Sequence, residues 1–209
     1  MTRIAVFASG RGSNFEALAA AAREGRVPAR IALLLSDRED AGALDVAARF
    51  GIEAVTLKPA GRRGPLDADW EAACLAACRR AGAEWICLAG FMRILGPALL
   101  DAYRDRVVNI HPSLLPSFPG LDAQRQAWEH GVRVSGCTVH LVDAGVDTGP
   151  IVAQRAVSTE GAGSADALAA RILEAEHVLY AEALERLLAG GWRRDGRRLV
   201  FTPSPEGRS

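Results

Sequence analysis

The feature that most constrains this sequence is a repeated alternation of short apolar runs with helix-forming stretches. The first run, residues 3–8, ends in a glycine-containing turn, and an Ala-rich helical stretch follows at 15–26. Further apolar runs lie at 31–35, 54–57, 85–89 and 107–110, and helices are predicted at 42–50, 66–81 and 97–103. Continuous apolar strands that alternate with helices are typical of a parallel sheet covered on both faces. We therefore predict an α/β fold, a single-domain, Rossmann-like, mostly parallel sheet with helices on both faces.

The pattern changes after residue 111. A Pro-rich loop at 112–120 leads to a predicted helix at 123–130. The runs at 137–142 and 151–157 alternate more strongly, as antiparallel strands do. A long helix is predicted at 165–188, followed by a hairpin at 192–201 that turns at Asp195-Gly196. We predict antiparallel additions in the C-terminal part of the sheet, one domain over residues 1–202, and a disordered tail at 203–209.

Charge and cysteine usage narrow the classes of partner. The 25 basic and 25 acidic residues balance, so no overall field attracts nucleic acid or an anionic membrane. No apolar run approaches the roughly 18 residues of a membrane span. We expect a cytoplasmic protein, monomer or homodimer, without nucleic-acid or membrane partners. Four cysteines without a C-x-x-C pair predict reduced core residues, and no His or Cys spacing indicates a metal site: Cys74, Cys78, Cys87, Cys137.

The loop after the first strand is a candidate phosphate site. Gly10 to Asn14 stand between a strand and a helix, where backbone N–H groups can hold an anion. Ser13 and Asn14 are also residue types that cap helices. The dinucleotide fingerprint is incomplete because Phe15 stands where its third glycine should be, although Asp37 has the place of a ribose-binding acid. The loop is therefore either an anion site or an ordinary tight turn.

Asn109 and His111 form the most informative pair. They are two residues apart at the end of a predicted strand, so both side chains lie on one face of the sheet, and Pro112 ends the strand pairing. Open α/β sheets bind ligands at this edge. Asn109 as a loop cap and His111 as a satisfied buried residue is the alternative. The pairing at a strand end, before a rigid proline loop, favours a functional site.

Three ordered motifs give a specific resemblance. They are Leu-Ala-Gly-Phe-Met-Arg-Ile-Leu at 88–95, Asn-Ile-His-Pro-Ser-Leu-Leu-Pro at 109–116 and Asp-Ala-Gly-Val-Asp-Thr-Gly-Pro at 143–150. The chain resembles the formyltransferase family that uses 10-formyltetrahydrofolate, and within it the members that act on glycinamide ribonucleotide. The resemblance implies transfer of the formyl group from this folate, a co-substrate, to the ribonucleotide amine in de novo purine biosynthesis, with small-molecule partners and no metal.

The same resemblance implies a catalytic trio of Asn109, His111 and Asp147. Asn109 would donate an N–H to the formyl oxygen as negative charge develops there. A protonated His111 would stabilise this oxyanion or protonate the leaving nitrogen, and Asp147 beside it would raise the His111 pKa.

The resemblance also implies the two ligand sites. Gly12, Ser13 and Asn14 would hold the ribonucleotide phosphate, and Glu176 would accept hydrogen bonds from the ribose hydroxyls, although sequence alone favours a solvated helix face for Glu176. The folate site would comprise Met92, Arg93, Ile94, Leu95, Asn109, Asp143, Ala144, Gly145, Val146 and Asp147. By sequence alone, Met92, Ile94 and Leu95 are typical of a core. Arg62 and Arg63 are candidates for the glutamate tail of the folate.

Two other functions fit parts of the pattern. A 10-formyltetrahydrofolate hydrolase would use water in place of the amine on the same trio, but such proteins usually carry an additional N-terminal domain, and this chain begins at its first predicted strand. A non-catalytic nucleotide-binding α/β module would bind a phosphate ligand without turnover. A transfer-RNA formyltransferase would need a second domain and a basic surface, which the length and the neutral charge do not provide.

Overall fold

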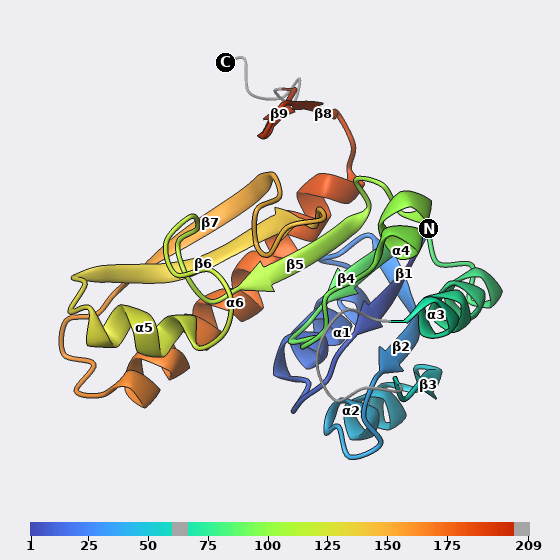
Figure 1. Ribbon diagram of the computed structural model, residues 1–209, viewed down its shortest axis with the longest axis horizontal. Helices are drawn as coiled ribbons and strands as arrows, with labels where there is room; N and C mark the ends of the chain where they lie inside the picture. Colours follow the sequence, from blue (N-terminus) through green and yellow to red (C-terminus); the bar gives the residue numbers. More distant parts are fainter. Residues whose placement is uncertain (60–66, 203–209) are drawn as a thin grey trace.

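The computed structural model describes residues 1–59 and 67–202 (Figure 1). Each predicted helix and strand is present, with bounds shifted by a few residues at most. The elements are β1 (Thr2–Phe7), α1 (Ser13–Arg23), β2 (Ala29–Ser36), α2 (Ala43–Phe50), β3 (Ala54–Thr56), α3 (Ala68–Arg80), β4 (Trp85–Leu88), α4 (Pro97–Ala102), β5 (Val107–His111), α5 (Ala123–Glu129), β6 (Val134–Leu141), β7 (Ile151–Ser158), α6 (Ala165–Leu188), β8 (Trp192–Asp195) and β9 (Arg198–Phe201). The predicted tail, and residue 66 at the start of the third predicted helix, lie outside the described residues.

The strands form one sheet in the order β3-β2-β1-β4-β5-β6-β7-β9-β8. Strands β1 to β5 pair in parallel, β6 runs antiparallel to β5, and β7 runs antiparallel to β6. The mostly parallel sheet with antiparallel additions is therefore confirmed. The neighbours of β1 on its two sides are β2 and β4, so the chain reverses its direction of winding there, and such a switch point opens a crevice at the carboxyl ends of the strands.

Helices cover both faces of this sheet. Along β1, Ile4 and Val6 pack into a core with α1, α2 and α6, while Ala5 and Phe7 pack into a second core with α3 and α4. Both faces of β1 are therefore buried, which explains its continuous apolar run. All four cysteines are free and buried, as predicted, and burial raises the pKa of the Cys87 thiol to about 12. The Cys87 thiol is therefore uncharged at neutral pH.

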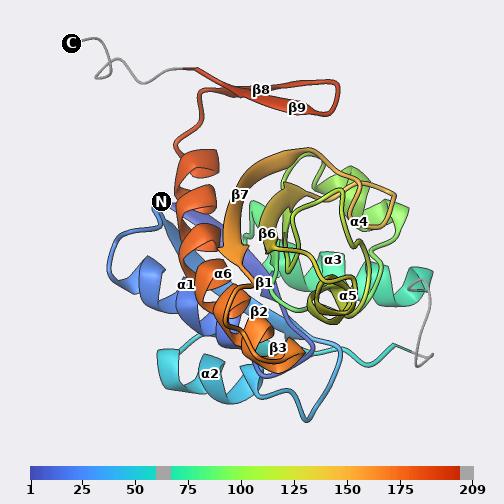
Figure 2. The same ribbon diagram turned by 90° about the vertical axis from the view of Figure 1, so that its left-hand side faces the viewer.

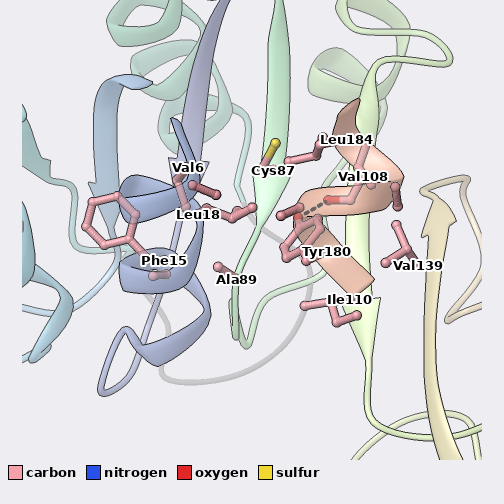
Figure 3. Packing of buried hydrophobic residues seen from close by; sticks show 14 of the residues in the cluster. Val6, Phe15, Leu18, Cys87, Ala89, Val108, Ile110, Val139, Tyr180 and Leu184 are labelled. Carbon is pink, nitrogen blue, oxygen red and sulfur yellow. Dashed lines mark hydrogen bonds between the residues drawn. The ribbon is translucent and has the colours of Figure 1, made fainter. Parts of the chain in front are cut away.

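Helix α6 packs in the first core and contacts strands β4 and β5. Its Ser164 cap accepts a hydrogen bond from Ala167 N–H. Tyr180 is buried with its hydroxyl 2.9 Å from the Leu88 carbonyl oxygen and 3.1 Å from that of Val108, so it lies against the end of β4 and the start of β5 (Figure 3). Glu176 precedes Tyr180 by one turn and is on the same side of the helix.

The hairpin β8–β9 follows the end of α6 and lies at one end of the molecule (Figure 2). Its side chains Trp192, Leu199 and Phe201 pack against the first core. It meets the sheet through one residue pair, Ile151 with Arg198. An ion pair of 2.8 Å between Arg194 and Asp105 also holds it. Within the two described ranges, no helix combines the length and the apolar character that crossing a membrane requires.

Candidate active site

The loops after β1, β4 and β5 meet at the carboxyl edge of the sheet. The loop after β1 contains a glycine that no other residue could replace without strain. Gly12 has φ 82°, and a Cβ atom there would lie 2.7 Å from the Ala43 Cα atom. Gly12 is also the N-cap of α1, and within residues 1–59 and 67–202 no side chain caps this helix. The suggestion that Ser13 or Asn14 caps it is wrong, since both are already helical. Without a side-chain cap, the first turn can offer backbone N–H groups to an anion.

Asn14 and Glu176 join this loop to α6. The Asn14 amide donates a hydrogen bond of 2.8 Å from Nδ2 to Glu176 Oε2. Glu176 is only 5% exposed, so the interpretation as a solvated helix face is wrong. Burial raises the pKa of Glu176 to about 7, and the Asn14 hydrogen bond acts in the opposite direction. The structure therefore places a buried carboxyl group beside the open helix N-terminus.

Asp147, from the β6–β7 connection, lies beside His111 of β5. Asp147 Oδ2 is 3.2 Å from His111 Nδ1 and accepts a hydrogen bond of 2.8 Å from Gly120 N–H. The other ring nitrogen, Nε2, is 2.8 Å from the Phe118 carbonyl oxygen. Both nitrogens thus face hydrogen-bond acceptors, an arrangement that suits a charged imidazole, in which both nitrogens are donors.

Burial opposes that charge. It lowers the pKa of His111 overall, although the Phe118 carbonyl and the Asp147 carboxylate both act to raise it. The expected effect of Asp147 therefore has the right direction but is outweighed. For Asp147, burial acts to raise the pKa, but the His140 imidazole, the Gly120 N–H and His111 together lower it. The site thus combines a carboxylate that favours its ionised form with an imidazole that holds its second proton weakly.

Asn109, the third member of the trio, contacts a further histidine, His140, on the neighbouring strand. Its Nδ2 is 3.1 Å from Nε2 of His140, which is buried and pairs with Asn109 across β5 and β6. His140 Nδ1 lies 2.9 Å from the Leu141 carbonyl oxygen and donates to it. In neutral His140, Nε2 therefore accepts one Asn109 N–H and leaves the second for a ligand. In protonated His140, Nε2 donates instead, and this form stabilises the Asp147 carboxylate. His140 Nε2 is also 3.5 Å from Asp147 Oδ1. The sequence signal for His140 was its place between the motifs at 109–116 and 143–150, close enough to the trio for a supporting role.

The segment after β4 has an inverted burial pattern. Met92 is 64% exposed and Ile94 is 49% exposed, whereas the Arg93 side chain between them is 11% exposed. Arg93 Nε donates a hydrogen bond of 2.9 Å to the buried Asp37, so Asp37 is engaged by a protein side chain at the place of a ribose-binding acid. The prediction of core positions is thus wrong for Met92 and Ile94 and confirmed for the buried Leu95.

The β6–β7 connection is held in shape by its own side chains. Asp143 Oδ1 accepts hydrogen bonds from Gly145 N–H and from the Thr148 hydroxyl, at 3.1 and 2.6 Å. Asp147 adopts a left-handed conformation with φ 54°, which directs it toward His111, while Val146 is exposed. Ala144 and Gly145 lie within the same turn. This connection therefore supplies the carboxylate on one side and an apolar side chain on the other.

The described residues hold no group of three or more His, Cys, Asp or Glu side chains placed to bind a metal ion. Arg62 and Arg63, the candidates for a ligand tail, lie outside the described residues.

The fold and the site together define a class. It is an α/β protein whose sheet carries at its carboxyl edge an amide, an imidazole and a carboxylate, together with a helix N-terminus and exposed apolar side chains. Residues 2–184 match the family model described as "Formyl transferase", and the chain belongs to that family.

Close relatives match over almost the whole chain. A phosphoribosylglycinamide formyltransferase of Bacillus subtilis is 43% identical over 188 residues, which cover 90% of this chain and 95% of the relative. The crystal structure of glycinamide ribonucleotide transformylase 1 from Symbiobacterium toebii superimposes with a TM-score of 0.91 at 44% identity, covering 97% of this chain and 95% of that one. A human trifunctional purine biosynthetic protein is 38% identical over 90% of this chain, which spans 18% of that protein's length.

Proposed function

We propose that this protein transfers the formyl group of 10-formyltetrahydrofolate to the amine of glycinamide ribonucleotide, a step of de novo purine biosynthesis. The observation that carries the proposal is the contact of His111 with Asp147, with Asn109 nearby on the same strand. The names of the relatives in Bacillus subtilis and Symbiobacterium toebii support the choice of substrate.

The ribonucleotide binds at the start of α1. The N–H groups around Gly12, Ser13 and Asn14 hold the phosphate, because a helix N-terminus carries partial positive charge and unpaired donors. Glu176 accepts hydrogen bonds from the ribose hydroxyls, and its contact with Asn14 sets the distance between the two subsites. This local geometry replaces an overall positive field, which a chain with balanced charges does not have.

The folate binds between the segment after β4 and the β6–β7 connection. Met92 and Ile94 on one side and Val146 on the other expose apolar side chains that suit a flat ring. Backbone groups of residues 92–95 and 143–147 supply the polar contacts to the pterin, together with Asn109. The side chains of Arg93 and Asp143 already have protein partners, so these residues contribute through their backbone.

In the reaction, the amine nitrogen attacks the formyl carbon, and the carbonyl oxygen becomes an oxyanion. The free N–H of Asn109 donates to that oxygen, an interaction worth about 10²- to 10³-fold in rate. His111 exchanges the Phe118 carbonyl for the reacting group, and its proton is stabilised by Asp147. The bond to the folate nitrogen then breaks. Overall, one proton leaves the amine and one reaches the folate nitrogen, so tetrahydrofolate and the formylated ribonucleotide are released.

We further propose that the protein acts in the cytoplasm on small molecules, as a monomer or homodimer, with no nucleic-acid or membrane partner. The chemistry above needs only protein side chains and the formyl folate co-substrate, and we propose that it proceeds without a metal.

The test is to mix the protein with 10-formyltetrahydrofolate, with and without glycinamide ribonucleotide, and to follow release of tetrahydrofolate. The proposal expects release only when the ribonucleotide is present. Equal release without it would indicate a hydrolase on the same trio. No release in either case, together with ribonucleotide binding that is insensitive to His111→Ala, would indicate a non-catalytic binding module.

A further inference from the structure

Hydrogen bonds and an ion pair join three neighbouring loops at the carboxyl edge of the sheet. They follow β2, β1 and β4, which are adjacent in the sheet. Ser9, after β1, donates its N–H to the Gly90 carbonyl at 3.2 Å, and its hydroxyl oxygen accepts the Met92 N–H at 2.9 Å. Arg93, in the same segment as Met92, reaches across to Asp37 after β2. The segment around Met92 is therefore held by Ser9 through its backbone and by Asp37 through the Arg93 side chain.

The ion pair between Arg93 and Asp37 contributes little to the stability of the fold, because burying both charges costs free energy of desolvation. Its side chains are 11% and 4% exposed, so both charges have lost most of their hydration. The second Asp37 oxygen, Oδ1, is buried with no hydrogen-bond partner within the described residues. Because a buried carboxylate with one unsatisfied oxygen contributes little net stability, the geometry that the pair imposes explains its presence better than a gain in stability does.

The ion pair determines which side chains of the segment 92–94 face the protein and which face solvent. With Arg93 held inward, the side chains of Met92 and Ile94 are exposed, although the charged residue would ordinarily be the exposed one. We propose that Asp37 and Ser9 are positioning residues for the formyl folate: they hold the segment Met92–Leu95 in its binding conformation before the ligand arrives. This inference rests on the proposed function, because it assigns that segment to the folate.

The test uses Asp37→Asn, which keeps the shape of the side chain and removes its charge. Asp40→Asn is the matched control, because Asp40 also pairs with an arginine, Arg38, but at an exposed site three residues away. Pre-ordering of a binding loop reduces the entropy lost on binding, so we expect the KM for 10-formyltetrahydrofolate to rise about tenfold or more in Asp37→Asn. The KM for the ribonucleotide and kcat at saturating folate should stay within about twofold to threefold, and Asp40→Asn should match the wild type in all three constants.

Ser9→Ala is a second variant, should Asp37→Asn fail to fold. It removes the acceptor for the Met92 N–H, and its KM for the folate should rise in the same way. An equal rise in the KM for both substrates, or a fall in kcat alone, would overturn the proposal in either variant.

Amide hydrogen exchange separates failure of this inference from failure of the proposed function, because it needs no turnover. In the ligand-free protein, Asp37→Asn should accelerate exchange across residues 91–95 and leave β4 unchanged, whereas Asp40→Asn should accelerate neither. Unchanged exchange at 91–95 would overturn the positioning role even in an active transferase. Faster exchange at 91–95 in Asp37→Asn, combined with a wild type that does not release tetrahydrofolate, would support the positioning role of Asp37 and reject the proposed substrate.

Discussion

Replacing Glu176 with glutamine should make the protein more stable at high pH while weakening its ribonucleotide site. The carboxyl group is 5% exposed, and burial raises its pKa from 4.5 to about 7. Because the folded-state pKa is the higher one, folding favours the protonated form. The resulting stabilisation is complete below pH 4.5 and is lost as the pH rises to about 7. A pKa difference of this size between the unfolded and folded states corresponds to about 3 kcal/mol in the free energy of unfolding.

The assay is urea denaturation of the wild type and Glu176→Gln between pH 4 and pH 8. Glutamine keeps an acceptor for the Asn14 N–H and cannot ionise, so the variant lacks this pH dependence. The free energy of unfolding of the variant minus that of the wild type should increase by about 3 kcal/mol across the range. Glu185→Gln, an exposed position on the same helix, should show a flat difference. A flat difference for Glu176→Gln as well would refute the argument from burial.

Three further substitutions test other parts of the account. His111→Ala should lower kcat by about 10²-fold or more in a steady-state assay, because it removes the proton donor, and turnover near that of the wild type would reject this role. Gly12→Ala should raise the KM for the ribonucleotide and lower the melting temperature, because a Cβ there meets Ala43 at a positive φ; an unchanged KM would argue against the phosphate loop. Tyr180→Phe should cost about 1–3 kcal/mol in urea denaturation by removing a buried hydroxyl that contacts the Leu88 carbonyl, and an unchanged midpoint would contradict that contact.

The sequence was sufficient for the elements of the fold because its apolar pattern agrees with the burial that the structure shows. In β1, every residue from Ile4 to Phe7 is buried between two layers of helices, so a continuous apolar run was a reliable signal. The same reasoning identified Asn109 and His111, since the alternation of side chains along one strand is a local property. The hairpin β8–β9 was also predictable, because Asp195-Gly196 specifies its turn.

Contacts between loops were not predictable by the same means. Asp147 reaches His111 only because the β6–β7 connection turns inward at a left-handed residue, and nothing local in the sequence specifies that direction. The pairing of Arg93 with Asp37 depends on the order of the strands that precede them. Met92 was misassigned to the core because hydrophobicity predicts burial, and that rule fails where an apolar side chain faces a ligand.

We propose that the formyl carbon moves directly to the ribonucleotide amine at the site formed by Asn109, His111 and Asp147. It is tested most directly by supplying 10-formyltetrahydrofolate labelled with ¹³C in the formyl group and following the label by NMR in the presence of glycinamide ribonucleotide. We predict that the label appears on the ribonucleotide amine, one for each tetrahydrofolate released. Label recovered as formate, with the ribonucleotide unmodified, would contradict the account.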